Sequence, residues 1–442
     1  MDTSTSSRLA ALLERNRAYI PGGISSANRL IDPPLAFVKG KGAHLWDLEG
    51  RRYIDYHAAF APHLLGHNFE PVNRAATEIL STGESLFGAG PSALEGRLAE
   101  LICKTVSTVD KLVLLNTGSE ATSLAVRLAR AVTGKKHVIV MQGGYNGNHD
   151  ELACNVFNSL AEIGPRVSPG EYPLRPLGAG TLLETMHVIH AINFNDLESV
   201  EYVCRRFPVG ALITEPVLQN IGVVHPRPDY LAGLRRLADQ YAFALIFDEV
   251  KTGFRHALGG YTGLCGVRPD LVVYGKAIAN GFPLAVVGGK KELMDRLSDP
   301  DSARRPFVAG TYNGHPVAVA AALRTIEYLK ENEQTIYPHL EALGGRMETG
   351  ITEIFARRGV RGCVARQGSA FSFYFMDRAP RDLHDIIEGH DFPKDLALRR
   401  ALIERGSFFI PIATKQCSIS AAHTAEDIDQ TLQAFDDALA AL

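Results

Sequence analysis

Two stretches of the sequence, LIFDEVKTGF (245–254) and VVYGKAIANGFP (272–283), each join a short apolar run to polar residues. An uninterrupted apolar run of this length is typical of a strand that is buried on both faces of a parallel sheet. The first run leads into Asp248, and the second leads into Lys276. Ligands of such sheets bind beyond the carboxyl ends of the strands, so these two side chains are the first candidates for chemistry.

Similar apolar runs alternate with helical patterns between about residues 110 and 290. Apolar side chains at helical spacing predict a helix over 121–132, ended by Gly134, and a second helix after Pro228 and Asp229. Strands that alternate with helices predict an α/β fold with a mostly parallel, doubly wound sheet. The expected strands are 112–115, 138–141, 211–214, 244–247, 271–274 and 285–288.

The alternation weakens after about residue 320, where two helical patterns precede the apolar run FSFYFM (371–376). This change predicts a smaller C-terminal α+β domain, residues 321–442, behind a large domain of residues 71–320. The N-terminal segment, residues 1–70, is expected to contribute to the small domain and to the active site. The segment 155–185 is rich in Pro and Gly, a composition typical of an active-site lid.

The composition excludes several classes of protein. The 442 residues carry a net charge of −3 and no long basic stretch, so neither nucleic acid nor an anionic membrane is an expected partner. No run approaches the roughly 20 apolar residues that span a bilayer, and we expect a cytoplasmic protein. The six cysteines form no CxxC pair and predict reduced thiols. The His187–His190 spacing falls in a strand-like run that would point the two rings to opposite faces, so no metal site is expected.

A third polar segment, Asn116-Thr117-Gly118-Ser119-Glu120, follows the strand expected at 112–115 and opens the first helix. Free N–H groups and the helix dipole at such a junction bind anions such as phosphate. The same residues also fit plain N-capping by Thr117 or Ser119.

Asp248 and Lys276 each admit a chemical and a structural interpretation. A carboxylate in an apolar strand requires a cationic or hydrogen-bonding partner, which a protonated pyridine nitrogen, a helix cap or a salt bridge would supply. A lysine in the crevice loses basicity and can attack an aldehyde, although a solvated strand-end lysine is the simpler alternative. A phosphate site, an acid and a lysine in this order favour the chemical interpretation.

In this combination the sequence resembles the class III aminotransferases of fold type I, which depend on pyridoxal 5′-phosphate (PLP). Within that family it is most similar to the glutamate-1-semialdehyde aminomutase branch, followed by the β-amino-acid transaminases. The resemblance runs from about Pro21 to the C-terminus. Its main motifs are PGGISSANR (21–29), GAHLWDLEGRRYIDY (42–56), LNTGSEAT (115–122), GGYNG (143–147), FDEVKTGFR (247–255), GKAIANGFP (275–283) and AGTYNGHP (309–316).

The resemblance implies a role for each matching residue. Lys276 matches the Schiff-base lysine and Asp248 the partner of the pyridine nitrogen, and both would be catalytic. Thr311 matches a threonine that reaches the phosphate of the partner subunit, which implies a homodimer with shared active sites. The other cofactor-binding matches are Gly118 and Ser119 at the phosphate, Tyr145 stacked on the ring (or packed in the core), Asn220 near the ring hydroxyl, and Glu215 supporting the ring pocket (or forming a structural salt bridge).

Three residues match substrate positions of the family. Arg29 matches the arginine that grips the substrate carboxylate, although an exposed N-terminal arginine is the alternative. Ser26 and Phe60 would line the same cavity.

Lys415 departs from the aminomutase pattern, which has a glutamate there, and Asn146 replaces a histidine. The reversed charge at Lys415 favours an anionic group on the substrate. We therefore expect an aminotransferase that moves an amino group between an amino acid and a keto or aldehyde acceptor.

Three alternatives come from other reaction or protein classes. An intramolecular aminomutase is the nearest, and a non-catalytic PLP-fold binding protein is a distant one. A nicotinamide dehydrogenase would need a G-x-G-x-x-G turn between a strand and a helix, which the sequence lacks.

Overall fold

The computed structural model describes residues 3–84, 88 and 90–442 of the chain. Its largest sheet has seven strands in the order β4-β10-β9-β8-β7-β5-β6. Only β10 runs antiparallel to its neighbours in this sheet, so the expected doubly wound, mostly parallel sheet is confirmed. The strands are β4 (Lys111–Leu115), β5 (His137–Met141), β6 (Ile189–Ile192), β7 (Val209–Thr214), β8 (Ala244–Glu249), β9 (Leu271–Tyr274) and β10 (Ala285–Gly289).

Helices cover both faces of this sheet because successive strand residues point to opposite sides. In β8, Ile246 belongs to the apolar cluster that contains α4 (Gly118–Thr133), whereas Leu245 and Phe247 belong to the cluster on the other face. That second cluster includes α7 (Leu197–Cys204) and α8 (Tyr230–Tyr241). Four further helices of the sheet region are short: α5 (Leu160–Ile163), α6 (Leu183–Met186), α9 (Gly260–Cys265) and α10 (Lys291–Met294).

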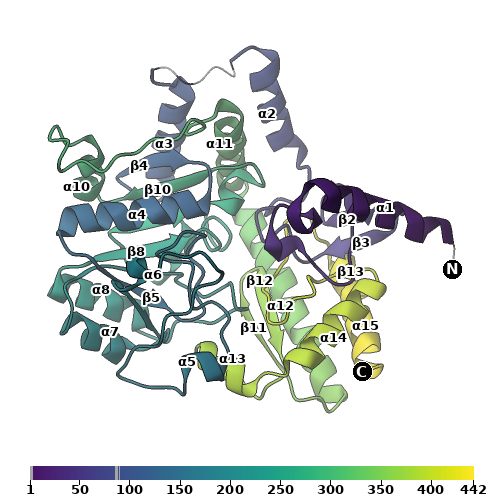
Figure 1. Ribbon diagram of the computed structural model, residues 1–442. Helices are drawn as coiled ribbons and strands as arrows, with labels where there is room; N and C mark the ends of the chain where they lie inside the picture. Colours follow the sequence, from purple (N-terminus) through teal and green to yellow (C-terminus); the bar gives the residue numbers. More distant parts are fainter. Residues whose placement is uncertain (1–2, 85–87, 89) are drawn as a thin grey trace.

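A group of three helices, α2, α3 and α11, packs together near the β4 end of the sheet (Figure 1). Their bounds are α2 (Glu70–Ser81), α3 (Ala93–Thr105) and α11 (Pro316–Glu331).

The two ends of the chain build the rest of the molecule together (Figure 1). Strand β3 pairs in parallel with β13, which lies more than 350 residues later in the sequence. The division of the chain at residues 70 and 320 stays a prediction. The elements are α1 (Thr3–Tyr19), β1 (Phe37–Lys41), β2 (His44–Asp47), β3 (Arg52–Asp55), α12 (Glu333–Arg357), β11 (Cys363–Gln367), β12 (Ala370–Tyr374), α13 (Leu383–Gly389), α14 (Phe392–Glu404), β13 (Ser407–Phe408), β14 (Cys417–Ser418) and α15 (Ala425–Ala440).

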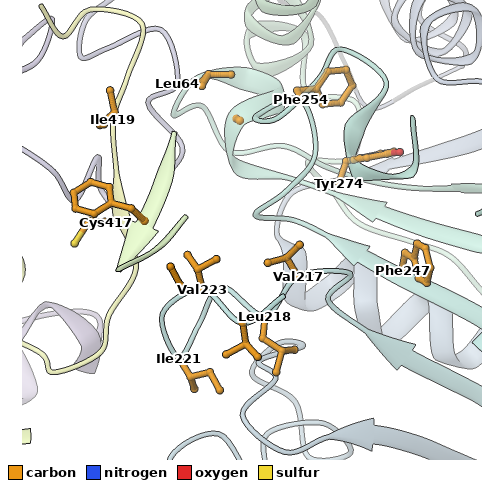
Figure 2. Close-up of a cluster of buried hydrophobic side chains, with 14 of the residues drawn as sticks. Leu64, Val217, Leu218, Ile221, Val223, Phe247, Phe254, Tyr274, Cys417 and Ile419 are labelled. Carbon is orange, nitrogen blue, oxygen red and sulfur yellow. The ribbon is translucent and has the colours of Figure 1, made fainter. Parts of the chain in front are cut away.

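Buried apolar side chains join these two regions into a continuous core. Figure 2 shows Val217, Leu218 and Val223, from the loop after β7, near Cys417 and Ile419 of the C-terminal region. All five side chains are almost completely buried. The loop after β7 is therefore fixed between the large sheet and the β14 region.

Three smaller expectations can be compared with the structure. All six cysteines are free thiols. The strand expected around His187 and His190 is only partly right: His190 lies in β6, with its Nδ1 2.6 Å from Glu171 Oε2, whereas His187 lies before the strand, at the end of α6. Among the described residues, no helix combines the length and the apolar character needed to cross a membrane.

A buried ion pair in α14 shapes the segment that carries Lys415. Arg399 Nε donates to Asp395 Oδ1 over 2.6 Å, and both side chains are inaccessible to solvent. The other oxygen of Asp395 accepts the backbone N–H of Thr414 (2.6 Å), and Arg399 Nη2 donates to the carbonyl of Lys415 (3.0 Å). The pair therefore fixes the backbone on both sides of the 414–415 peptide.

We expect Asp395→Ala to lower the free energy of unfolding by about 3–5 kcal/mol, because it leaves the Arg399 guanidinium buried without its counter-ion. Urea unfolding monitored by circular dichroism measures the change. The matched control is Asp429→Ala, which breaks an exposed pair with Arg346 and is expected to leave the midpoint nearly unchanged. Equal shifts for the two variants would contradict the prediction.

Candidate active site

A cavity of about 280 Å³ lies where the carboxyl ends of five sheet strands meet. Its walls come from segments that follow β4, β5, β7, β8 and β9. Seven of the residues that the sequence singled out line it: Gly118, Ser119, Tyr145, Glu215, Asn220, Asp248 and Lys276.

The amino terminus of α4 forms one wall of this first cavity. Thr117 is the N-cap, since its hydroxyl accepts the N–H of Glu120, and the Glu120 carboxylate accepts the N–H of Thr117 (2.9 Å). This capping box leaves the N–H groups of Gly118 and Ser119 at the first helical turn, where they have no intrahelical acceptor. A Cβ at Gly118 would lie 3.1 Å from a methyl group of Val250, so glycine keeps this wall open.

Asp248 presents a buried carboxylate to the cavity from β8. Its Oδ2 accepts a hydrogen bond from Asn146 Nδ2 (2.9 Å), and its Oδ1 accepts the N–H of Val250 (3.0 Å). Loss of hydration and repulsion from Glu215 raise the pKa of Asp248 to about 6. No side chain in the described part of the chain forms an ion pair with it, so the carboxylate would stabilise a cation placed in the cavity.

Glu215 organises the wall next to Asp248. Its Oε1 accepts the N–H of Tyr145 (3.1 Å) and the amide of Asn220 (2.9 Å), and its Oε2 accepts the N–H of Gln219 (2.8 Å). This carboxylate therefore connects the turn after β5 to the loop after β7 by hydrogen bonds.

Lys276 follows β9 directly and begins a short 3₁₀ helix, Lys276–Ala279. Its backbone has a φ of 48°, in the left-handed region that costs a non-glycine residue about 1–3 kcal/mol. Burial lowers the pKa of Lys276, and nearby Arg255 contributes in the same direction, whereas Asp248 and Glu215 oppose it. A strained backbone and an amine of reduced basicity are both properties of a nucleophilic lysine.

A second cavity, of about 630 Å³, contains the predicted substrate residues Arg29, Ser26 and Phe60. These residues do not line the first cavity. Arg29 is exposed at the rim, in the short 3₁₀ helix Ala27–Arg29.

An unusual backbone turn positions Phe60 in the second cavity. Residues 58–61 all have φ between 49° and 82°, although none is glycine. Two charged groups stabilise this left-handed turn: Asp55 accepts the N–H groups of His57 and Ala58, and Arg255 donates to the carbonyl of Ala61 (2.6 Å). Such strain persists only where the surroundings fix it, and it often marks a functional site.

Two predicted residues lie outside both cavities. Lys415 is 8% exposed, and its Nζ lies 5.9 Å from the centroid of the Phe60 ring and 3.4 Å from the carbonyl oxygen of Asn220. It therefore lies between a residue of the second cavity and a residue of the first. Thr311 is exposed, in the loop before α11.

Sequence reasoning missed two polar residues of the first cavity region. Asn146 was noted only as a departure from a family pattern, yet it donates to Asp248. Lys251 was not singled out, and it lines the first cavity with a buried side chain. Its position three residues after Asp248, in the same strand-end motif, was the available signal.

The family model for "Aminotransferase class-III" matches residues 26–439. The chain belongs to the class III aminotransferases. This membership confirms the enzyme class, fold type I and the cofactor, PLP, that the resemblance implied.

Similar proteins include both aminomutases and transaminases. A glutamate-1-semialdehyde 2,1-aminomutase from Syntrophomonas wolfei is 36% identical over 98% of this chain and 97% of its own length. The structure of an omega-transaminase from Sphaerobacter thermophilus is 28% identical, with a TM-score of 0.89 over 98% of this chain and 97% of that one. A β-phenylalanine aminotransferase from Variovorax paradoxus is 26% identical, with a TM-score of 0.83 over 99% and 95%.

Three lysines occupy this region, Lys251 and Lys415 buried and Lys276 partly buried, and we expect only Lys276 to bind PLP covalently. Borohydride reduction of the holoenzyme followed by peptide mass mapping locates the attachment. Lys251 and Lys415 are built-in controls, because they are also buried and their pKa values are also lowered. Label on either of them, with Lys276 unmodified, would contradict the assignment.

Proposed function

We propose that this chain is a PLP-dependent aminotransferase that moves an amino group between a carboxylate-bearing amine and a keto or aldehyde acceptor. The observation that carries the proposal is the convergence of Asp248, Lys276 and the α4 terminus on one cavity. A non-catalytic PLP-fold binding protein is disfavoured because the amine that performs the chemistry is present in that cavity.

The residues of the first cavity fit the cofactor. The N–H groups of Gly118 and Ser119 would hold the phosphate at the helix terminus. Asp248 lacks a cation among the described side chains, and a protonated ring nitrogen would supply one. Tyr145 would pack on the ring, Asn220 would lie near the ring hydroxyl, and Glu215 would keep both in place through its hydrogen bonds.

When bound, PLP supplies an aldehyde carbon that carries the amino group and a ring that accepts electron density. Asp248 would hold the proton at the ring nitrogen, because an ionised carboxylate in a dry site strongly favours a neighbouring cation. Lys276 would take the proton from the carbon beside the substrate amine and return a proton to it. Burial lowers the pKa of Lys276, so a larger share of its amine is unprotonated and able to accept that proton.

The second cavity would bind the substrate. Arg29, at its rim, can form two parallel hydrogen bonds with a carboxylate, and Ser26 can add a hydroxyl contact. Phe60 supplies an apolar wall. Phe157 belongs to the segment expected to form a lid. The centroid of its ring lies 5.7 Å from Lys415 Nζ, so this segment lies close to the proposed substrate region.

An intramolecular aminomutase is the second candidate, favoured by the aminomutase relatives at about 35% identity over nearly the whole chain. Such an enzyme returns the amine to a neighbouring carbon of the same molecule and holds an intermediate with two amino groups. The buried Lys415 opposes a second amine by charge repulsion, which favours transfer between molecules.

Incubating the pyridoxamine form with glutamate-1-semialdehyde separates the two candidates. We expect little 5-aminolevulinate without an added acceptor, because the cationic Lys415 disfavours the diamine. Lys415→Glu is expected to raise mutase turnover by about tenfold or more, since it reverses this charge. Chromatographic quantification of 5-aminolevulinate measures both. Efficient wild-type turnover without an acceptor would overturn the preference for transamination.

We also infer a homodimer with shared active sites. Thr311 is exposed in this chain, in agreement with a threonine that reaches the phosphate in a partner subunit. Phe307, four residues earlier in the same loop, is 77% exposed, as expected of a side chain that a partner covers.

Thr311→Ala is therefore expected to raise the Kd for PLP by about tenfold through loss of a hydrogen bond to a charged group, without dissociating the dimer. Equilibrium dialysis measures the Kd, and light scattering measures the mass. Thr352→Ala, an exposed threonine of α12, is the control and should leave both unchanged. A monomeric wild-type protein would contradict the inference.

A further inference from the structure

Lys251 has no role in the chemistry described so far, yet it lines the cofactor cavity. It lies in the turn after β8, and its Nζ donates to the carbonyl of Gln219 (2.7 Å) and to Gln416 Oε1 (3.0 Å). Both acceptors are neutral. Transfer of an ammonium group into the protein interior is costly unless an anion compensates for the lost hydration.

Lys415 directly precedes Gln416, which accepts a hydrogen bond from Lys251, and its ammonium group likewise has no anionic partner among the described residues. Its Nζ has one long hydrogen bond, to the carbonyl of Asn220, and faces the rings of Phe60 and Phe157. Aromatic faces stabilise a cation only modestly. In the described part of the chain, neither lysine forms an ion pair with a carboxylate.

The charges of this region do not balance once the cofactor residues are assigned. Asp248 would be engaged by the ring nitrogen, which leaves Glu215 as a nearby carboxylate that acts on both lysines through its charge but, among the described residues, forms no ion pair with either. Lys251 and Lys415 are thus two buried amines without a carboxylate in direct contact among the described residues. Lys415 reaches toward the second cavity through its contact with Phe60.

We propose that Lys251 and Lys415 form a second anion subsite, and that the physiological substrate or acceptor carries an anionic group besides the carboxylate held at Arg29. Dicarboxylic amino acids and keto acids are the chemical class that fits. This inference rests on the proposed function, since it takes Arg29 as the first carboxylate site. Lys415 would contact the second anionic group, and Lys251 would be a positioning residue that adds positive potential behind it.

The protonation of Lys415 gives the subsite a pH signature. Burial and then repulsion from Lys276 lower the pKa of Lys415 to about 8, with Arg399 adding to the shift and Glu215 opposing it. The neighbouring Lys251 is also less basic than usual, because of burial and repulsion from Lys415 and Lys276.

His57, which also faces the two lysines, stays neutral, since burial lowers its pKa to about 3. An anion binds the protonated lysine, so affinity for a dianion should be high below pH 8 and fall as the pH rises through about 8. A monoanion held by the Arg29 guanidinium does not depend on Lys415, so its affinity should show no such fall.

The test compares glutarate with valerate, two unreactive five-carbon ligands with two and one carboxylates, by titration calorimetry on the PLP-loaded holoenzyme at pH 7. We expect glutarate to bind about tenfold more tightly or better, and its advantage to diminish between pH 7 and pH 9.

Lys415→Gln should bring the ratio of the two Kd values close to one, and Lys251→Gln, which keeps a donor for the Gln219 carbonyl, should reduce it partly. Lys330→Gln removes an exposed charge at the end of α11 and should leave the ratio unchanged.

Equal Kd values for the two ligands in the wild type, or a ratio that neither buried variant alters, would overturn the subsite. Amino transfer from a panel of monocarboxylic and dicarboxylic amino acids, measured separately, keeps the two proposals distinguishable. If transfer occurs without preference for dicarboxylates and glutarate has no advantage, the proposed function stands and the subsite fails. If glutarate binds more tightly but no amino acid donates its amine, the proposed function fails while the subsite stands.

Discussion

A carboxylate held inside an apolar sheet, that of Asp248, is the constraint on which the rest of the site depends. It lies at the end of β8, almost fully buried, with two neutral hydrogen-bond donors. Such a group is costly to bury, and its raised pKa reflects that cost. The protein retains the group because a bound cation can recover the lost stabilisation, which couples occupancy of the cavity to the stability of the sheet end.

The backbone around the cavities is strained, and charged side chains maintain the strain. Lys276 and the turn at residues 58–61 adopt left-handed conformations without glycine. Arg255 stabilises the 58–61 turn by donating to the carbonyl of Ala61, and its charge also lowers the pKa of the Lys276 amine. The buried Arg255 guanidinium thus acts on two places, through a hydrogen bond to the 58–61 turn and through its charge on the Lys276 amine. Replacing the non-glycine residues by glycine would relieve the strain but would also remove the side chains that the turn presents.

Most of the large sheet could be predicted because its strands are buried on both faces. Runs such as 244–247 and 271–274 have no polar interruption, and a buried strand must satisfy this condition whatever its neighbours are. Asp248 and Lys276 could be located for the same reason, since a charge directly after such a run lies at the carboxyl edge of the sheet. The antiparallel direction of β10 was not predictable, because a short apolar run carries no information about its direction.

Other features depended on contacts between distant segments. The hydrogen bond from Asn146 to Asp248 joins residues 102 positions apart, and no local pattern predicts it. The left-handed turn at 58–61 has the composition of a helix or a strand, and its conformation follows from Asp55 and Arg255.

Lys251 resembles a surface lysine in the sequence, and its burial results from Gln219 and Gln416, which approach it from two other segments.

The parts of the proposed function therefore depend on different features, some encoded by local sequence and others by contacts between distant segments. The sheet edge, which local sequence encodes, determines the cofactor chemistry. The proposed substrate residues depend on long-range packing, because Arg29, Phe60 and Lys415 come from the two ends of the chain.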